Sequence, residues 1–223
     1  MITARSALIP LVALGFLPMA DGSLQAAEKV PLVLELPRPM FVGTPVPVKI
    51  ANMEAPRQGA RPPFLVPAGT ENLAKGKKVT SSDMEPLLGD LDQITDGEKA
   101  GDEGNFVEIG KGKQWVQIDL GASKELHALV IWHFHSQARV YKGVVVQVSD
   151  DANFVTGVGT LFNNDIDNLN GLGIGKDKNY TETAEGKLID GKGVKARFVR
   201  LYSNGNTTTE TNHYTEVEVY GLP

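Results

Sequence analysis

The stretch that most constrains the fold of this 223-residue chain is QWVQIDLG, residues 114–121. Its apolar residues Val116, Ile118 and Leu120 alternate with polar ones. A period of two predicts a strand with one buried face, and the closing glycine predicts a turn at its end. Trp115 is out of phase with the apolar trio, so we expect it to cover the end of the strand or a second layer of contacts.

Further strand signals recur along the chain, and no segment has a convincing helical period. Leu126 to Phe134 is apolar at nearly every position, which is typical of a central strand buried on both faces. Val144 to Val148 alternates, as a strand with one buried face does. Similar signals occur at 197–202 and 216–220, and Gly, Asn and Asp clusters separate the segments. The pattern predicts an all-β antiparallel sandwich.

The N-terminus is typical of an export signal. Arg5 precedes an apolar run over residues 7–19, and the small residues Ala26 and Ala27 suit a signal peptidase. The run is too short to span a bilayer as a stable helix. We therefore predict a signal peptide over residues 1–27, no transmembrane segment after its cleavage, and a secreted, periplasmic or cell-surface protein. A buried N-terminal helix is the alternative.

Composition limits the partners and the chemistry. A net charge of -5 and a sequence without a basic patch disfavour nucleic acid and anionic membranes, which both attract clustered Lys and Arg. The chain has no cysteine, so disulfides, thiol chemistry and thiolate metal sites are unavailable. A metal held by oxygen ligands remains as a means of fastening the loops.

Residues 28–71 contain nine prolines, and that density predicts an extended segment rather than a folded domain. We interpret the segment as a Pro-rich linker or extended arm. Two short pieces, 32–36 and 46–50, alternate well enough to add as edge strands, either to the following domain or to another protein.

Residues 72–223 form the predicted folded domain. Its polar, Gly-rich stretch over 163–185 is longer than most ordered loops. Asp165 and Asp167 resemble the start of an EF-hand loop, but the glycine and the closing glutamate are missing from their positions.

Four pieces in order carry a family resemblance: NLAKGKKVTSS at 72–82, TDG at 95–97, the 114–121 stretch, and ARFVRL at 196–201 with EVEVYG at 216–221. Together they resemble a discoidin domain, the coagulation factor 5/8 C-terminal type, in the galactose-binding-like superfamily, and specifically a bacterial secreted member. The resemblance implies an eight-stranded jelly-roll β-sandwich over 72–223. It also implies that loops at one end bind carbohydrate, as in bacterial sugar-binding members, or lipid or protein, as in animal ones.

The resemblance further implies a structural Ca²⁺ ion near the Asp-Gly turn. The family often has Thr or Ser five residues after the Asp, where this chain has Gly101, and Asp102 or Glu103 could compensate. The alternative is a plain turn and a solvated glutamate. Carried over by position, the ligands are the side chains of Asp96 and Glu216 and the main-chain oxygens of Gln93, Glu98 and Thr215.

The candidate ligand-binding residues lie around the unusual sequence WHFH at 132–135. A sugar site needs an apolar ring for the C–H face of the pyranose and a few fixed donors and acceptors. Structural histidines are an alternative, and so is a transition-metal site formed by two histidines and a third. We expect Trp132 and Phe134 in the core. From loop position alone, the candidates are His133, His135, Arg139, Asn204, Asn206, His213 and Tyr214.

No catalytic motif stands out. The chain has no thiol, no nucleophile elbow, no zinc-protease helix and no phosphate-binding glycine loop. We therefore predict a secreted, non-catalytic module that binds carbohydrate or a cell-surface glycan. The alternatives are a structural or adhesive role, in which the arm binds a protein, and a metal-dependent hydrolase.

Overall fold

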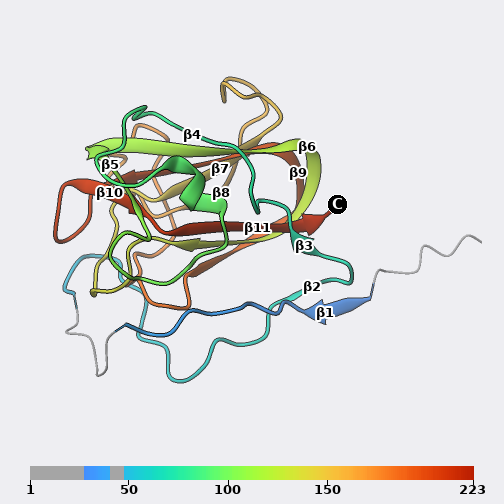
Figure 1. Ribbon diagram of the computed structural model, residues 1–223, viewed down its shortest axis with the longest axis horizontal. Helices are drawn as coiled ribbons and strands as arrows, with labels where there is room; N and C mark the ends of the chain where they lie inside the picture. The colour runs from blue at the N-terminus through green and yellow to red at the C-terminus, as the bar shows by residue number, and fades with distance from the viewer. Residues whose placement is uncertain (1–27, 41–47) are drawn as a thin grey trace, which may run out of the picture.

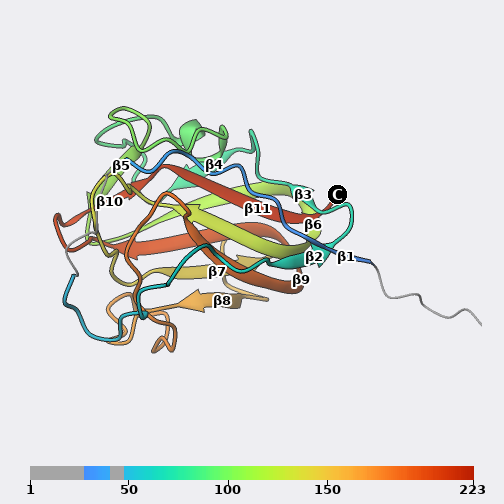
Figure 2. The same cartoon turned by 90° about the horizontal axis from the view of Figure 1, so that it is seen from below.

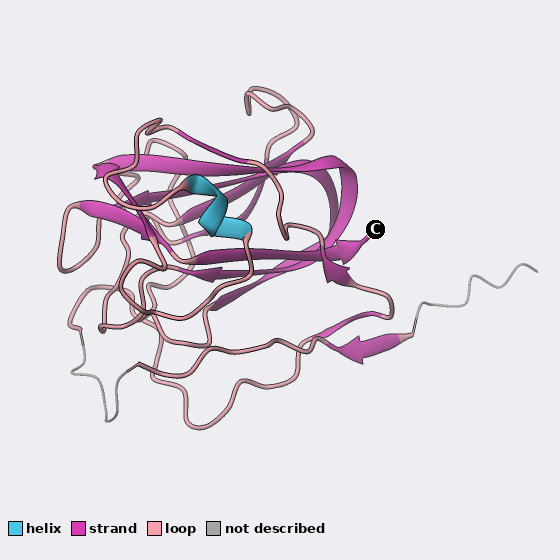
Figure 3. Cartoon of the chain, viewed as in Figure 1, coloured by secondary structure: helices cyan, strands magenta, loops and turns pink. Residues whose placement is uncertain are grey.

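The computed structural model describes residues 28–40 and 48–223, so the predicted signal peptide lies outside the described residues. The regular elements of these residues are strands and one short 3-10 helix (Figures 1 and 3). In chain order the elements are β1 (Lys29–Pro31), β2 (Leu65–Pro67), β3 (Glu71–Asn72), β4 (Val79–Ser81), η1 (Leu91–Thr95), β5 (Val107–Lys111), β6 (Lys113–Trp132), β7 (Val145–Ser149), β8 (Gly159–Asn163), β9 (Lys187–Asn204), β10 (Thr211–Tyr214) and β11 (Glu216–Leu222).

Two long strands, β6 and β9, belong to both layers of the fold. They pair antiparallel over 113–119 with 198–204, and again over 124–131 with 187–196. Both strands curve round one end of the molecule between these stretches (Figure 1). β4, β7 and β8 extend the first layer, whereas β11 and β3 extend the second. This arrangement confirms the predicted antiparallel β-sandwich.

The main core lies between the two layers. Val116, Ile118 and Leu120 are at most 2% exposed, which confirms the face predicted from their alternation. The predicted end of this strand is wrong, because β6 continues through Gly121. Gly121 has a φ of 89°, a left-handed conformation that glycine adopts without a steric penalty. The glycine therefore marks the bend between layers rather than the end of the strand.

The second half of β6 is buried on both faces, as its continuous apolar sequence predicted. Leu129 and Ile131 face the main core. Val130 and Trp132 face the other way, into a smaller cluster with Tyr220 of β11. Something must cover that outer face, because Trp132 is completely buried.

The Pro-rich arm is the cover. β1 pairs with β2, and the side chains of Leu32, Leu34 and Phe64 pack on the cluster around Trp132. Figure 2 shows the arm lying across the second layer. Val33, between the two leucines, is 83% exposed. The interpretation of the described arm residues as a linker is therefore wrong. Residues 32–36 do not form the predicted edge strand, because β1 ends at Pro31, and the piece at 46–50 lies partly outside the described residues.

The long polar loop between β8 and β9 is ordered by its own side chains. Asp165 is buried, and its carboxylate accepts hydrogen bonds from the backbone N–H groups of Leu169 (2.9 Å) and Asn170 (2.8 Å). These oxygens are occupied by the loop itself.

Candidate ligand-binding end of the sandwich

The end of the sandwich opposite the β6–β9 bend is built from loops and the β5–β10 pair (Figure 1). β6 ends at Trp132, and the chain continues through His133 and Arg139 across this end. β10 reaches the same end from the other direction and delivers His213 and Tyr214. Two segments far apart in the sequence therefore meet at this end.

His133 is at the centre of a buried polar cluster. Its Nδ1 lies 2.7 Å from Oε1 of Glu182, and neither side chain is exposed. Because a carboxylate only accepts hydrogen bonds, Nδ1 carries the hydrogen. The imidazole stacks on Tyr141 with a centroid distance of 4.2 Å and lies 4.9 Å from the ring of Tyr214. Sequence reasoning missed Tyr141 as part of the cluster and Glu182, which has no local signal.

Arg139 and His213 complete the buried polar cluster. The guanidinium carbon of Arg139 lies 4.4 Å from the ring centre of Phe134. The ring of Phe134 in turn lies 6.1 Å from that of His213. Nε2 of His213 is 3.5 Å from Oε1 of Glu108. Burial lowers the pKa of His213 to about 4, and the positive charge of Arg139 acts in the same direction. His213 is therefore neutral at physiological pH.

Several polar atoms of this cluster have no hydrogen-bond partner among the described residues. Two of these atoms are the hydroxyl oxygens of Tyr141 and Tyr180. Burial and the negative charge of Glu182 raise the pKa of both hydroxyls well above the ordinary value. Buried polar groups without partners are rare in native proteins and mark positions for water or a polar ligand group. The atoms are His133 Nε2, Arg139 Nε, Tyr141 Oη, Tyr180 Oη, Glu182 Oε2 and His213 Nδ1.

The predicted contact residues are covered in this structure rather than displayed. His133, His213 and Tyr214 are at most 4% exposed, and Arg139 is 8% exposed. His135 is separated from them, since its Nε2 lies 2.9 Å from the carbonyl oxygen of Lys99. The imidazoles therefore form an internal framework under the loops, as the alternative of structural histidines proposed. Within the described chain, no three His, Cys, Asp or Glu side chains are placed to hold a metal ion.

An open groove of about 490 Å³ lies at the same end, and we call it the loop-end groove. Asn206 shapes its main loop, because Oδ1 accepts hydrogen bonds from the N–H groups of Thr208 (2.8 Å) and Thr209 (3.0 Å). Leu169, 62% exposed, adds an apolar side chain. Of the predicted residues, Asn204 and Asn206 line this groove; Lys142, Leu169 and the threonines were missed. The lining is Lys111, Gly112, Lys142, Leu169 and residues 204–210.

The Asp-Gly turn and Glu216 meet as the calcium hypothesis requires. The N–H of Gly97 donates to Oε2 of Glu216 at 3.2 Å, and Oε1 is buried without a partner among the described residues. Burial raises the pKa of Glu216 to about 9, and the negative charges of Glu218 and Asp96 act in the same direction. A buried carboxylate oxygen without a partner, next to an Asp-Gly turn, fits a cation held partly by main-chain oxygens, and such a cation would hold the carboxylate ionised.

Asp96 and Gln93, two of the other expected calcium ligands, lie at the same turn. Oδ1 of Asp96 accepts from the N–H of Glu98 at 2.7 Å, and Gln93 lies in η1, directly before the turn. A Cβ atom at Gly101 would lie 2.3 Å from Oγ of Ser136, whose hydroxyl donates to the Gly101 carbonyl oxygen. Ser136 thus fills the space of the Thr or Ser side chain that the family often has there.

The antiparallel β-sandwich with loops at one end is the jelly-roll architecture of discoidin-type modules. The model of the F5/8 type C domain family matches residues 78–217. The chain belongs to this family, which confirms the resemblance. No curated protein matches the chain significantly.

Solved structures share the fold at low identity. A CBM32-4 module produced by Clostridium perfringens, in complex with GlcNAc-α-1,4-galactose, is 14% identical with a TM-score of 0.51, over 70% of this chain and 97% of that one. A family 89 glycoside hydrolase from the same organism is 19% identical with a TM-score of 0.50, over 68% of this chain but 15% of that one. Chitosan-binding module 1 from a Paenibacillus sp. IK-5 chitosanase/glucanase is 21% identical with a TM-score of 0.46, over 68% and 99%.

Proposed function

We propose that this chain is a secreted, non-catalytic carbohydrate-binding module that takes a glycan in the loop-end groove and carries a structural Ca²⁺ ion. The observation that carries the proposal is the chemistry of that groove. Thr208 and Asn204 offer hydroxyl and amide groups, Lys142 adds a donor, and Leu169 gives an apolar side chain. A few fixed polar groups beside an apolar contact suit a saccharide.

The glycan proposal is tested by calorimetric titration of the protein with a panel of neutral oligosaccharides. We expect weak binding that Thr208→Val, Lys142→Gln or Leu169→Asp reduces. Thr80→Val, an exposed threonine on β4 outside the groove, is the matched control and should leave binding unchanged. Binding that all three groove variants retain would place the glycan elsewhere, and no binding across the panel would refute the proposal.

The calcium proposal rests on Glu216 and the Asp96–Gly97 turn. The side chains of Asp96 and Glu216, with main-chain oxygens of Gln93, Glu98 and Thr215, would hold the ion. A bound cation would fasten the first loop to β11 and stabilise the folded state by mass action. We expect calcium to raise the midpoint of thermal unfolding relative to EDTA, and Glu216→Gln to abolish that rise. An identical midpoint of thermal unfolding in calcium and in EDTA would contradict the proposed calcium site.

Two further parts of the proposal, export and the lack of catalytic activity, can each be tested on the protein itself. Within the described residues, no helix is long and apolar enough to cross a membrane. N-terminal sequencing of the mature protein should show cleavage after Ala27. Incubation of the calcium-loaded protein with glycosides and esters should show no turnover. Binding of another protein through residues 28–71 remains a prediction, which a pull-down with the intact chain would test.

A further inference from the structure

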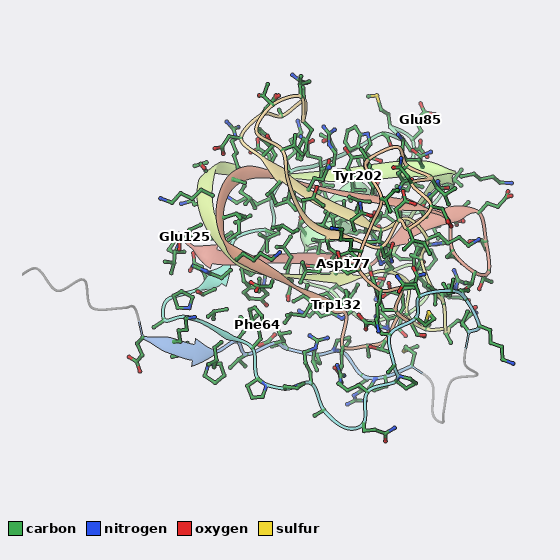
Figure 4. The ribbon with its side chains drawn as sticks, turned by 180° about the vertical axis from the view of Figure 1, so that it is seen from behind. Phe64, Glu85, Glu125, Trp132, Asp177 and Tyr202 are labelled. Carbon is green, nitrogen blue, oxygen red and sulfur yellow. The ribbon has the colours of Figure 1, made fainter. Side chains whose placement is uncertain are left out.

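A second groove, of about 420 Å³, lies away from the loop-end groove and shares no lining residue with it. Its walls come from β8, the end of the loop before β9, the start of β9, and Glu54 of the arm. Figure 4 shows this side of the molecule, with Asp177 labelled. Four lysines line it: Lys176, Lys178, Lys187 and Lys192. We call it the lysine groove.

The acidic side chains of the lysine groove already have partners. Glu54 forms an ion pair with Lys187. Oδ2 of Asp177 accepts a hydrogen bond from the N–H of Asn163 at 2.6 Å, and Oδ1 of Asp190 accepts one from the N–H of Lys192 at 2.8 Å. Glu54 is thus neutralised by Lys187, whereas Asp177 and Asp190 keep their negative charges and are oriented by backbone N–H groups.

Three of the four lysine ammonium groups in the lysine groove have no ion-pair partner among the described residues. Lys187 is held by Glu54 and lies 4.7 Å from the ring centre of Tyr180. Among the described residues, the side chains of Lys176, Lys178 and Lys192 form neither an ion pair nor a hydrogen bond, and all three are exposed. Four lysines against three acids give the lining a net charge of +1, although the whole chain has a net charge of -5.

The remaining walls narrow the chemistry of the ligand. Leu161 and Leu188 are partly exposed apolar lining residues, whereas Phe162 and Ile189 are buried in the main core behind them. A small inorganic anion gains nothing from such walls, whereas the C–H faces of pyranose rings do. The volume lies within the range of about 300–1,000 Å³ that is usual for small-ligand clefts. Cations around a partly apolar groove suit a sugar that carries negative groups.

We propose that the lysine groove is a second binding site, for an acidic saccharide whose residues carry carboxylate or sulfate groups. Lys176, Lys178 and Lys192 contact the anionic groups, and the apolar walls contact the rings. The ion pair of Lys187 with Glu54 fastens the arm to one side of the groove.

The test compares titrations of the intact protein with three hexasaccharides: an oligouronate, a sulfated galactan and an uncharged glucan. We expect the triple variant Lys176→Gln, Lys178→Gln, Lys192→Gln to lower the affinity for an acidic hexasaccharide by roughly tenfold, the sum of three exposed ion pairs. Added salt should weaken binding to the wild type more than to the variant. Preference for uronate or for sulfate identifies the anionic group.

A triple variant at Lys29, Lys78 and Lys124, each changed to Gln, is the matched control. It removes the same net charge from other parts of the surface, so retained affinity separates the groove from a general charge effect. Equal losses in both variants would overturn the proposal, as would equal affinity for a thymidine hexanucleotide, which would indicate unspecific anion attraction. Loss of neutral-glycan binding through the loop-end variants leaves this result unchanged, so the two proposals fail separately.

Discussion

At the residue scale, the pair of His133 and Glu182 should be one of the most sensitive positions of the fold. Glu182→Ala leaves Nδ1 of His133 buried without an acceptor. Leaving a buried hydrogen-bond donor without its acceptor costs about 1–3 kcal/mol, and more where the group is charged. Urea denaturation should therefore show a loss of that size. Glu182→Gln keeps an oxygen for the Nδ1–H group and should cost less, while Glu71→Ala, on exposed β3, should cost almost nothing. Equal losses at Glu182 and Glu71 would contradict the pairing.

His213 should make stability depend on pH. Its pKa is about 4 in the folded protein, mainly because of burial, against about 6.5 when unfolded. Between these values the unfolded chain binds the proton and the folded one does not, so stability is present above pH 6.5 and falls as the pH falls towards 4. The slope from one such group is about 1.4 kcal/mol per pH unit.

Thermal or urea unfolding from pH 8 to pH 4 tests this dependence by comparing the wild type with His213→Gln. Other groups titrate in the same range, so the difference between the two curves is the relevant quantity. The wild type should lose more stability than the variant as the medium becomes acidic. Parallel curves would mean that His213 is as easily protonated in the folded as in the unfolded protein.

At the element scale, the turn before β9 should be intolerant of any side chain at Gly186. Gly186 has a φ of 65°, and a Cβ atom there would lie 2.7 Å from the indole of Trp132. The indole N–H also donates to the carbonyl oxygen of Ala184 at 3.0 Å, so the ring cannot easily move away. Gly186→Ala should reduce the unfolding free energy by about 2–4 kcal/mol, from left-handed strain and overpacking together.

Gly171 provides the matched control for this prediction. Its φ is 70°, almost the same as at Gly186, but a Cβ atom added there would have no atom within 4 Å. Gly171→Ala therefore reports left-handed strain alone, about 1 kcal/mol. The difference between the two variants in denaturant unfolding measures the clash with Trp132. Equal costs would show that the turn yields without penalty.

Sequence alternation could predict which residues of β6 are buried but not where the strand changes layer. The inward face of Val116, Ile118 and Leu120 follows from the period of two alone. Gly121 has the same local signature whether it ends a strand or bends one, and only the pairing of both halves of β6 with β9 decides between them. The arm was misjudged for a related reason, since proline density reports backbone conformation and not the surface that Leu32 and Leu34 cover.

At the scale of the whole molecule, sequence patterns could predict where the candidate binding residues lie but not which residues cover them. The position of His133 directly after a predicted strand and of His213 shortly before another predicted that both lie at one end of the sandwich, where His133 follows β6 and His213 lies in β10. Their burial could not be predicted, because the residues that cover and pair with them, Glu182 and Tyr141, have no motif. The lysine groove was invisible as well, since Lys176 and Lys192 approach each other only through the path of the loop and the start of β9.

The arm should be an integral part of the folded unit, and an intact chain can show this. Leu32→Asp with Leu34→Asp places charges against the cluster of Trp132 and Tyr220. Burial of an apolar side chain contributes about 1.5–3 kcal/mol, so releasing the partly buried leucines should cost about 3 kcal/mol. In a Trp115→Phe background Trp132 is the remaining tryptophan. Its emission should shift to the red as the arm detaches and water reaches the indole.

The control for the arm lies on its outer side. Val33 and Leu36 are 83% and 51% exposed, so Val33→Asp with Leu36→Asp adds the same charge without touching the cluster. This variant should keep both the blue emission of Trp132 and the unfolding midpoint of the wild type. If the inner variant also keeps them, the arm contributes nothing to the burial of Trp132 and is the free linker that its prolines suggest. If the inner variant alone loses them, the second layer of the sandwich is complete only with the arm in place.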